Sequence, residues 1–241
     1  MSLIVTLYVP EGIVLAGDSR LTLNWITKSA TGEQTHSISA SDSNNKIFVI
    51  KDKFGLGTFG TASINGIPIA GFINQFTEQF VKEDTTIDEM PQLLLDFFGS
   101  QFNYPAINFY LIGYKVEHGI STPYAYFTNI AEKTYNRINT AGEKVINGAN
   151  WGGEIEVLLR LIQSVKVNQC GNWVELPNSS IPWDYMTLQD AIDFSLYAVR
   201  TTIETIRFQQ KEKTVGGPID ILVLKPNEKP IWINKKELKG E

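Results

Sequence analysis

The order of the predicted strands and helices is the feature of this sequence that most restricts its fold. Runs of β-branched and aromatic residues predict strands at the start, middle and end of the chain, and apolar residues at helical spacing predict a pair of helices in each interval between them. Single helices between strands would indicate a doubly wound parallel sheet. Because the helices come in pairs, we expect instead an α+β fold in which antiparallel sheets pack against helix pairs.

The boundaries of the predicted elements follow from periodicity, turn residues and helix-capping pairs. Thr86 with Glu89 and Thr187 with Asp190 each have the spacing of a capping box, which marks a helix start. The predicted helices are residues 64–80, 86–98, 151–165 and 188–210. The predicted strands are residues 3–9, 13–16, 46–50, 54–59, 106–116, 124–130, 133–138, 144–147, 219–224 and 230–234. A polar segment, 28–45, is expected to be an exposed loop or hairpin, and residues 1–241 are expected to form one domain.

Charge and cysteine content exclude several classes of protein. The net charge of −5 does not favour binding to nucleic acid or to an acidic membrane surface. The single cysteine, Cys170, leaves no intrachain disulfide, so we expect a reducing, cytoplasmic compartment. No apolar run reaches membrane-spanning length. The two histidines, His36 and His118, are far apart in sequence, which disfavours a zinc site or a Ser-His-Asp triad but leaves a role for His36 open.

The short motifs of the common enzyme classes are missing from the sequence. It has no glycine-rich phosphate loop, Cys-x-x-Cys pair, His-Glu-x-x-His motif or Gly-x-Ser-x-Gly elbow, and we therefore expect no cofactor. The polar residues that stand out are Ser2 before the first strand, Asp18 after the second, and Lys46 at the start of a later one. Gly60, which follows the strand 54–59, completes the set.

Five segments together resemble a proteasome β-type subunit, as a divergent, bacterial-like member of the N-terminal-nucleophile (Ntn) hydrolase superfamily. They are Gly12-Ile-Val-Leu-Ala-Gly-Asp-Ser-Arg20, Asn45-Lys-Ile-Phe-Val-Ile50, Gly60-Thr-Ala-Ser63, Asn147-Gly148 and Val215-Gly-Gly-Pro-Ile-Asp-Ile221. The resemblance covers nearly the whole chain. It implies the four-layer αββα sandwich of Ntn hydrolases, with two antiparallel sheets between helix pairs.

The resemblance also implies a role for each site residue. Ser2 falls where the family has its N-terminal threonine nucleophile, so removal of Met1 would make it the first residue. Asp18 matches the acid that orients the active-site lysine, Lys46 matches that lysine, and Gly60 matches the residue whose N–H completes the oxyanion hole. Asn147 stands where the family has a supporting serine. The segment between Arg20 and Lys46 is longer than in a typical member.

The implied chemistry is consistent with these residue types. A free α-amine has an ordinary pKa of about 7.7–8.0 and can take the proton from its own residue's hydroxyl. A nearby Lys46 ammonium would lower the pKa of that amine and stabilise the developing alkoxide, while Asp18 would hold the lysine. A backbone N–H at Gly60 would stabilise the oxyanion, a contribution of about 3–4 kcal/mol to the barrier in comparable sites.

We therefore predict a threonine-type endopeptidase or amidohydrolase that cleaves peptide bonds through Ser2. The resemblance adds a homo-oligomeric ring, a peptide or protein substrate and an ATPase partner. Two alternatives remain. One is a non-catalytic, proteasome-like structural or binding subunit, because Glu212 and Val215 replace an aspartate and a serine of the family. The other is an Ntn hydrolase of small amides. On a structural reading, Asp18 with Arg20 is a strand-end ion pair and Lys46 a charge at a strand edge.

Overall fold

The computed structural model describes residues 2–29 and 32–237, except for the side chains of residues 24–26, 28–29 and 35–37. Met1, whose removal the predicted chemistry requires, and the side chain of His36 lie outside this description. The described residues form four α-helices and several antiparallel sheets, which confirms a mixed α+β fold. No helix in ranges 2–29 and 32–237 combines the length and the apolar character needed to cross a membrane.

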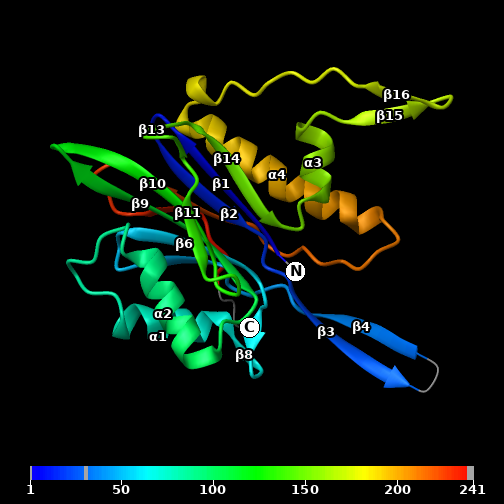
Figure 1. Ribbon diagram of the computed structural model, residues 1–241, viewed down its shortest axis with the longest axis horizontal. Helices are drawn as coiled ribbons and strands as arrows, with labels where there is room; N and C mark the ends of the chain where they lie inside the picture. The colour runs from blue at the N-terminus through cyan, green and yellow to red at the C-terminus, as the bar shows by residue number, and fades with distance from the viewer. Residues whose placement is uncertain (1, 30–31, 238–241) are drawn as a thin grey trace.

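The first of two five-stranded sheets, which we call the N-terminal sheet, is built around β1 and β2. Its strand order is β14 (Gly148–Gly153), β1 (Leu3–Val9), β2 (Gly12–Gly17), β17 (Asp220–Leu224) and β18 (Ile231–Asn234). All neighbouring strands are antiparallel. The two ends of the chain thus meet in one sheet, and β1 lies between β2 and β14 (Figure 1).

The second five-stranded sheet is built from the middle of the chain. Its order is β11 (Thr134–Arg137), β10 (Ile120–Asn129), β9 (Ile107–Glu117), β6 (Phe54–Gly60) and β5 (Ile47–Ile50), again antiparallel throughout. Four two-stranded ribbons complete the strands. They are β3 (Leu21–Ser29) with β4 (Gly32–Ser41), β7 (Ser63–Ile64) with β8 (Ile67–Pro68), β12 (Thr140–Ala141) with β13 (Lys144–Val145), and β15 (Lys166–Gln169) with β16 (Asn172–Glu175).

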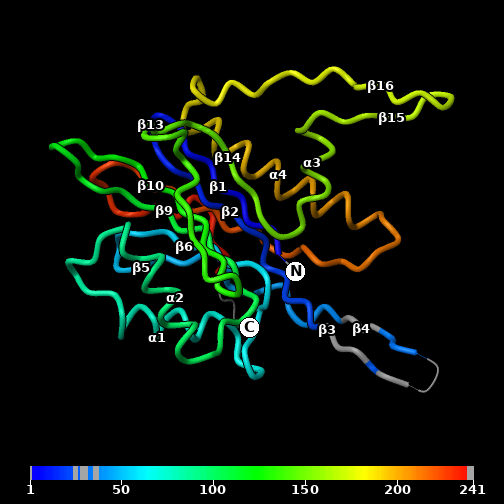
Figure 2. The backbone as a smooth tube through the Cα atoms, viewed as in Figure 1, coloured from blue at the N-terminus to red at the C-terminus, as the bar shows by residue number. Residues whose placement is uncertain are grey.

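The helices lie on the two sides of the sheets. Helices α3 (Glu156–Ile162) and α4 (Leu188–Phe208) cover the N-terminal sheet, and α1 (Ile69–Gln79) and α2 (Met90–Phe102) lie against the second sheet (Figure 2). Side chains of β1 alternate, as a buried strand requires. Leu3, Val5 and Leu7 belong to the apolar cluster with α3 and α4, whereas Ile4 and Tyr8 belong to a cluster shared with the second sheet.

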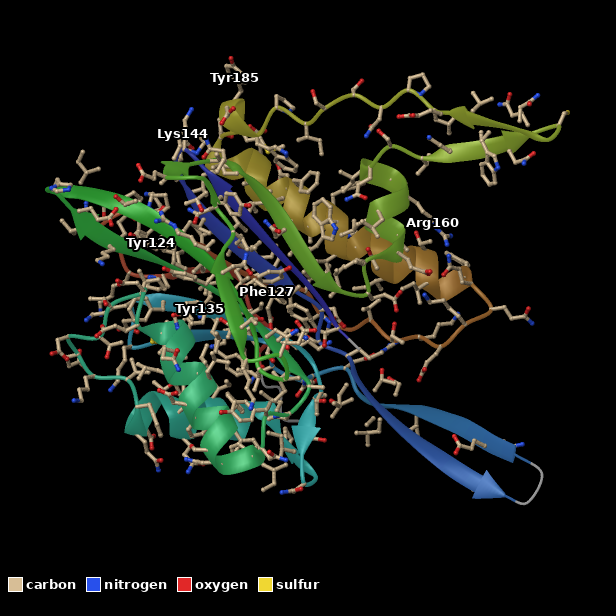
Figure 3. All side chains as sticks on the ribbon, viewed as in Figure 1. Tyr124, Phe127, Tyr135, Lys144, Arg160 and Tyr185 are labelled. Atoms are coloured by element: carbon tan, nitrogen blue, oxygen red, sulfur yellow. The ribbon has the colours of Figure 1, made fainter. Side chains whose placement is uncertain are left out.

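Aromatic side chains fill much of the space between the elements. Phe127, on β10, has its ring centroid 6.2 Å from that of Phe59 and 5.7 Å from that of Tyr110, within the cluster that both sheets share (Figure 3). Under the helix pair α1–α2, Phe76 and Phe97 are fully buried with centroids 5.6 Å apart. Such pairs contribute about 0.5–1.5 kcal/mol beyond their buried area.

Except for the start of 124–130, the predicted strands match observed strands to within two residues, and of the predicted helix starts only the one at residue 188 matches. The segment 64–80 begins with the β7–β8 hairpin, because Asn65 and Gly66 both have positive φ (51° and 79°), so α1 starts only at Ile69. The Thr86–Glu89 hydrogen bonds form, but α2 starts at Met90 and its first turn carries no side-chain cap. The predicted helix 151–165 begins as strand β14.

Two other segments differ from the prediction. The polar segment is the β3–β4 hairpin, which starts earlier than predicted, at Leu21, and extends away from the sheets (Figure 1). The segment 168–184, for which no strand was predicted, contains the last two residues of β15 and all of β16. The Thr187–Asp190 capping box at the start of α4 is confirmed, with hydrogen bonds in both directions.

Candidate active site

The carboxylate of Asp18 is the centre of a buried polar cluster at one end of the N-terminal sheet. The residue follows directly after β2, and its Oδ1 accepts from the Leu3 N–H at 2.9 Å and from Lys46 Nζ at 2.7 Å. Its Oδ2 accepts from the N–H groups of Arg20 (3.1 Å) and Gly216 (3.0 Å). Because four donors converge on a carboxylate with no exposed side-chain surface, the charge is buried but fully compensated.

Lys46 brings a positive charge to the same point from the second sheet. It immediately precedes β5, and its carbonyl accepts from the Thr58 N–H of β6 at 2.9 Å, which fixes its backbone. Its side chain is 2 % exposed. Burial lowers the pKa of the Lys46 ammonium, although the neighbouring Asp18 carboxylate opposes the shift.

Ser2 lies beside this ion pair and is itself 3 % exposed. Its neighbour Leu3 donates the hydrogen bond to Asp18, and the Ser2 carbonyl accepts from the Glu154 N–H at 2.8 Å. Gly153, opposite Leu3 in β14, has a φ of 96°, and a Cβ on it would lie 1.8 Å from the Ser2 carbonyl oxygen. The backbone around Ser2 is therefore held from both neighbouring strands.

Gly60 lies at the end of β6 that points towards Ser2. A Cβ on Gly55 would contact Leu222. Leu222 pairs with Leu15 of β2, and Leu15 pairs with Thr6 of β1, so Gly55 lies at the level of Thr6. A Cβ on Gly57 would contact Ile4, which is closer to the start of β1. Later residues of β6 therefore lie beside earlier residues of β1, and Gly60, the last residue of β6, lies towards Ser2. Gly60 has a φ of 101°, a conformation that favours glycine, and an added Cβ would lie 2.5 Å from the carbonyl oxygen of Ala106.

A cavity of about 510 Å³ opens beside Gly60. Its lining residues are small or polar: Thr22, Leu23, Gly60, Thr61, Ala62, Ser63 and Ala106. The Thr22 hydroxyl is buried and has no hydrogen-bond partner among the described residues. The end of β6 therefore combines a position that requires glycine with an adjoining cavity.

Asn147 is the one predicted site residue that the structure does not bring to this cluster. It precedes β14, where Gly148 pairs with Tyr8 at the far end of β1, whereas Gly153 pairs with Leu3. At about 3.4 Å per residue, the length of β1 separates Asn147 from Ser2. Its side chain donates instead to Asp184 Oδ1 at 2.9 Å. The prediction that Asn147 supports the Ser2 amine is wrong.

Residues at the other end of β14, which the sequence reasoning missed, lie next to the Ser2 backbone instead. Glu154 follows Gly153, and its side chain is 5 % exposed. Its Oε1 accepts from Lys211 Nζ at 2.9 Å and its Oε2 from the Thr214 hydroxyl at 2.7 Å. Desolvation raises the pKa of the Glu154 carboxyl, but the hydrogen bonds from Lys211 and Thr214 outweigh it and hold that pKa below its ordinary value.

Val215, which replaces a serine in the resemblance, packs in the apolar cluster beneath α4 and is 1 % exposed. The preceding residue, Thr214, supplies a hydroxyl instead, and the following residue, Gly216, supplies the N–H bonded to Asp18. The sequence signal that could have identified Glu154 and Thr214 is weak, because each is a single polar residue outside any motif: Glu154 directly follows the Gly152-Gly153 pair, and Thr214 is separated by Val215 from the Gly216-Gly217 pair.

A second buried ion pair lies next to the first. Asp220 pairs with Gly17 across β17 and β2, and its carboxylate accepts from the backbone N–H of Lys236 at 2.8 Å and from the Lys236 ammonium. The positive charge of Lys236 adds to the lowering of the Lys46 pKa. Within ranges 2–29 and 32–237, no group of three or more His, Cys, Asp or Glu side chains could hold a metal ion.

The structure thus places the residue that carries the Ser2 hydroxyl next to a buried ammonium–carboxylate pair, a combination suited to the activation of a hydroxyl nucleophile. A scan against protein-family models and a search of curated protein sequences both find no match to this chain.

Proposed function

We propose that this protein is a proteasome-like Ntn hydrolase that cleaves amide bonds of peptides through Ser2 once Met1 is removed. The observation that carries the proposal is the buried Lys46–Asp18 ion pair, 2.7 Å long, which Asp18 Oδ1 ties to the N–H of Leu3, the residue next to Ser2. A buried ion pair is weak evidence for stability alone. Its placement next to the first residue of the mature chain favours a role in activating that residue.

The proposed fold is the four-layer αββα sandwich of Ntn hydrolases in a single domain. Three apolar clusters support it: one between α1–α2 and the second sheet, one with residues of both sheets, and one between the N-terminal sheet and α3–α4. A sandwich of this kind needs apolar side chains on both faces of each sheet, and the N-terminal sheet has them in the second and third of these clusters.

In the proposed mechanism, the free α-amine of Ser2 takes the proton from the Ser2 hydroxyl as the oxygen attacks the substrate carbonyl. The Lys46 ammonium stabilises the developing negative charge, and the N–H of Gly60 donates to the oxyanion. The proton passes from the α-ammonium to the leaving amine, which leaves an ester on Ser2. Water, deprotonated by the same α-amine, then hydrolyses the ester and regenerates the hydroxyl.

The assembly proposed with this activity is a homo-oligomeric ring in the cytoplasm, which admits a peptide or unfolded protein and works with an ATPase. These partners rest on the resemblance alone. The residues to which the proposed mechanism assigns roles all belong to one chain.

One observation favours the alternative of a non-catalytic, proteasome-like subunit. Val215 buries an apolar side chain where the resemblance has a hydroxyl, and the Glu212 carboxylate replaces an aspartate. Such a subunit would keep Asp18 and Lys46 as a structural ion pair. A hydrolase of small amides is the third proposal, and the cavity of about 510 Å³ beside Gly60 is large enough for such a substrate.

Labelling of Ser2 separates these proposals. The chain from Ser2 onward would be released from a cleavable N-terminal fusion, its intact mass measured, and the protein treated with a peptide epoxyketone, which reacts with an α-amine and a hydroxyl on one residue. We expect one adduct on Ser2, none in Ser2→Ala, and none in protein that retains Met1. No adduct on the Met-free protein would support the non-catalytic subunit, and hydrolysis of small amides without peptide cleavage would support the third proposal.

A further inference from the structure

The hydrogen bonds around Ser2 form a closed circuit that includes a second buried carboxylate. Glu154 donates its N–H to the Ser2 carbonyl (2.8 Å) and accepts from the Thr214 hydroxyl (2.7 Å). Two residues later, the Gly216 N–H donates to Asp18 (3.0 Å), which in turn accepts from Leu3 (2.9 Å). Three segments remote in sequence thus converge on the first residue of the proposed mature chain.

The carboxylate of Glu154 is buried, and its burial requires hydrogen-bond donors in place of water. Its side chain is 5 % exposed, and transfer of a carboxylate out of water is unfavourable unless donors replace the water. An ionised carboxylate has about four acceptor positions. Among the described residues, Lys211 and Thr214 each donate to one of its oxygens, so acceptor capacity is left for a further donor.

The Ser2 nitrogen lies close to the backbone of Glu154. It is joined to its own carbonyl oxygen by three bonds, a span of about 3 Å, and that oxygen is 2.8 Å from the Glu154 nitrogen. The two nitrogens are therefore no more than about 6 Å apart, and a glutamate side chain extends about 4–5 Å from its Cα.

From this geometry we propose that Glu154 is a positioning residue that holds the α-amine of Ser2 after Met1 is removed. The inference rests on the proposed function and deepens it, because it assigns the partner of the amine that acts as general base. The carboxylate orients the amine towards the Ser2 hydroxyl and stabilises the ammonium that forms when the amine accepts the proton.

With this assignment, Lys46 and Glu154 have opposite effects on the pKa of the Ser2 amine. The Lys46 ammonium favours the neutral amine, and the Glu154 carboxylate favours the protonated amine, so the pair adjusts the pKa of the amine between them. Other charged groups lie on or next to the elements packed against β1. They are Asp18, Arg20 and Asp42 near β2, Asp220 and Lys236 near β17, and Glu156, Lys211, Glu212 and Lys213 near α3 and the end of α4.

The experiment measures the pKa of the Ser2 amine directly, without a substrate. Met-free protein is labelled at a series of pH values with a limiting amount of an amine-reactive reagent, and the modified N-terminal peptide is quantified by mass spectrometry. In Glu154→Gln we expect the pKa of the amine to be lower by about one unit than in the unsubstituted protein, because a neutral amide replaces the carboxylate. Glu154→Asp, which keeps the charge, is expected to restore most of the shift.

Glu156→Gln is the matched control. It removes the same charge two residues away, and Glu156 shares Lys211 with Glu154 (Nζ–Oε2 3.4 Å), but its side chain is 59 % exposed. An amine with the same pKa in Glu154→Gln and Glu156→Gln would overturn the proposal. A shift specific to Glu154→Gln, in a protein that neither reacts with the epoxyketone nor hydrolyses amides, would support the placement of Glu154 and refute the proposed function.

Discussion

Removing the charge of Asp18 should destabilise the protein much more than removing the charge of Lys46. Asp18 accepts four hydrogen bonds, three of them from the backbone N–H groups of Leu3, Arg20 and Gly216. Among the described residues, Asp18 is the only side chain bonded to the Lys46 ammonium. Loss of the Asp18 carboxylate therefore leaves the Lys46 ammonium and three backbone N–H groups without their acceptor, whereas loss of Lys46 removes only one of the four donors to Asp18.

The magnitudes follow from these contacts. In Asp18→Asn an NH₂ group replaces one oxygen and faces donors, and the buried Lys46 loses its counter-charge, so we expect a loss of about 3–5 kcal/mol in the free energy of unfolding. In Lys46→Met the carboxylate keeps its three backbone donors, and we expect a loss of about 1–3 kcal/mol. Adding Lys46→Met to Asp18→Asn removes an unpaired buried ammonium and should restore about 1–3 kcal/mol.

Urea unfolding followed by tryptophan fluorescence measures all three values, since the chain has five tryptophans. If Lys46→Met lowers the free energy of unfolding as much as Asp18→Asn, the reasoning is refuted. It is also refuted if the double variant is less stable than Asp18→Asn alone. Under the proposed function, both single variants and the double variant fail to form the epoxyketone adduct, whatever their stability.

Three further substitutions test separate features. Gly60→Ala should lower the free energy of unfolding by about 1–3 kcal/mol, because φ is 101° and the new Cβ would lie 2.5 Å from the Ala106 oxygen. Thr187→Ala should lower it by about 1 kcal/mol through loss of the α4 capping box. Burial raises the pKa of Tyr8 to about 12, whereas in the unfolded chain the hydroxyl loses its proton near its ordinary pKa of about 10. The free energy of unfolding should therefore fall as the pH rises from about 10 to about 12. Tyr8→Phe should reduce that fall.

Each of these has a matched comparison. Gly66→Ala places a side chain at a φ of 79° with no atom within 4 Å, so it reports backbone strain without the contact at Ala106. A loss in Gly60→Ala no larger than in Gly66→Ala would mean that the close contact is relieved elsewhere. Thr187→Ser keeps the capping hydroxyl and should retain most of the stability. An unchanged slope of stability against alkaline pH in Tyr8→Phe would contradict the assignment to Tyr8.

The strands were predictable because their burial and their sequence pattern agree. β1 is buried along its whole length, and its β-branched and aromatic run ends at Pro10, so the prediction of residues 3–9 matches the observed bounds. The start of α1 was missed because Ile64 and Ile67 have helical spacing. The Asn65-Gly66 pair between them is a stronger local signal for a hairpin turn, and it decides the structure.

The candidate site was predicted in part for a similar reason. Asp18 and Lys46 adjoin strands whose positions were correct, so the structure brings them together. Asn147 was placed by a short motif, and the register of β14 against β1 moves it to the wrong end of the strand. Glu154 and Thr214 have no motif, and their importance depends on long-range contacts that no local pattern contains.

The base of the β3–β4 hairpin makes this part of the chain modular. Leu21 pairs with Ser41. In the residues that flank this pair, the Arg20 guanidinium donates hydrogen bonds to both carboxylate oxygens of Asp42, at 2.6 and 2.7 Å. Since the chain leaves and returns at one point, the part of the hairpin beyond the Leu23–Ile38 pair can be shortened, lengthened or exchanged while the path from Asp18 to Lys46 and the cavity beside Gly60 are preserved. A peptide tag or a second small domain inserted there would extend away from the sheets. Retention of the buried Asp18–Lys46 ion pair would indicate that the rest of the chain has kept its fold.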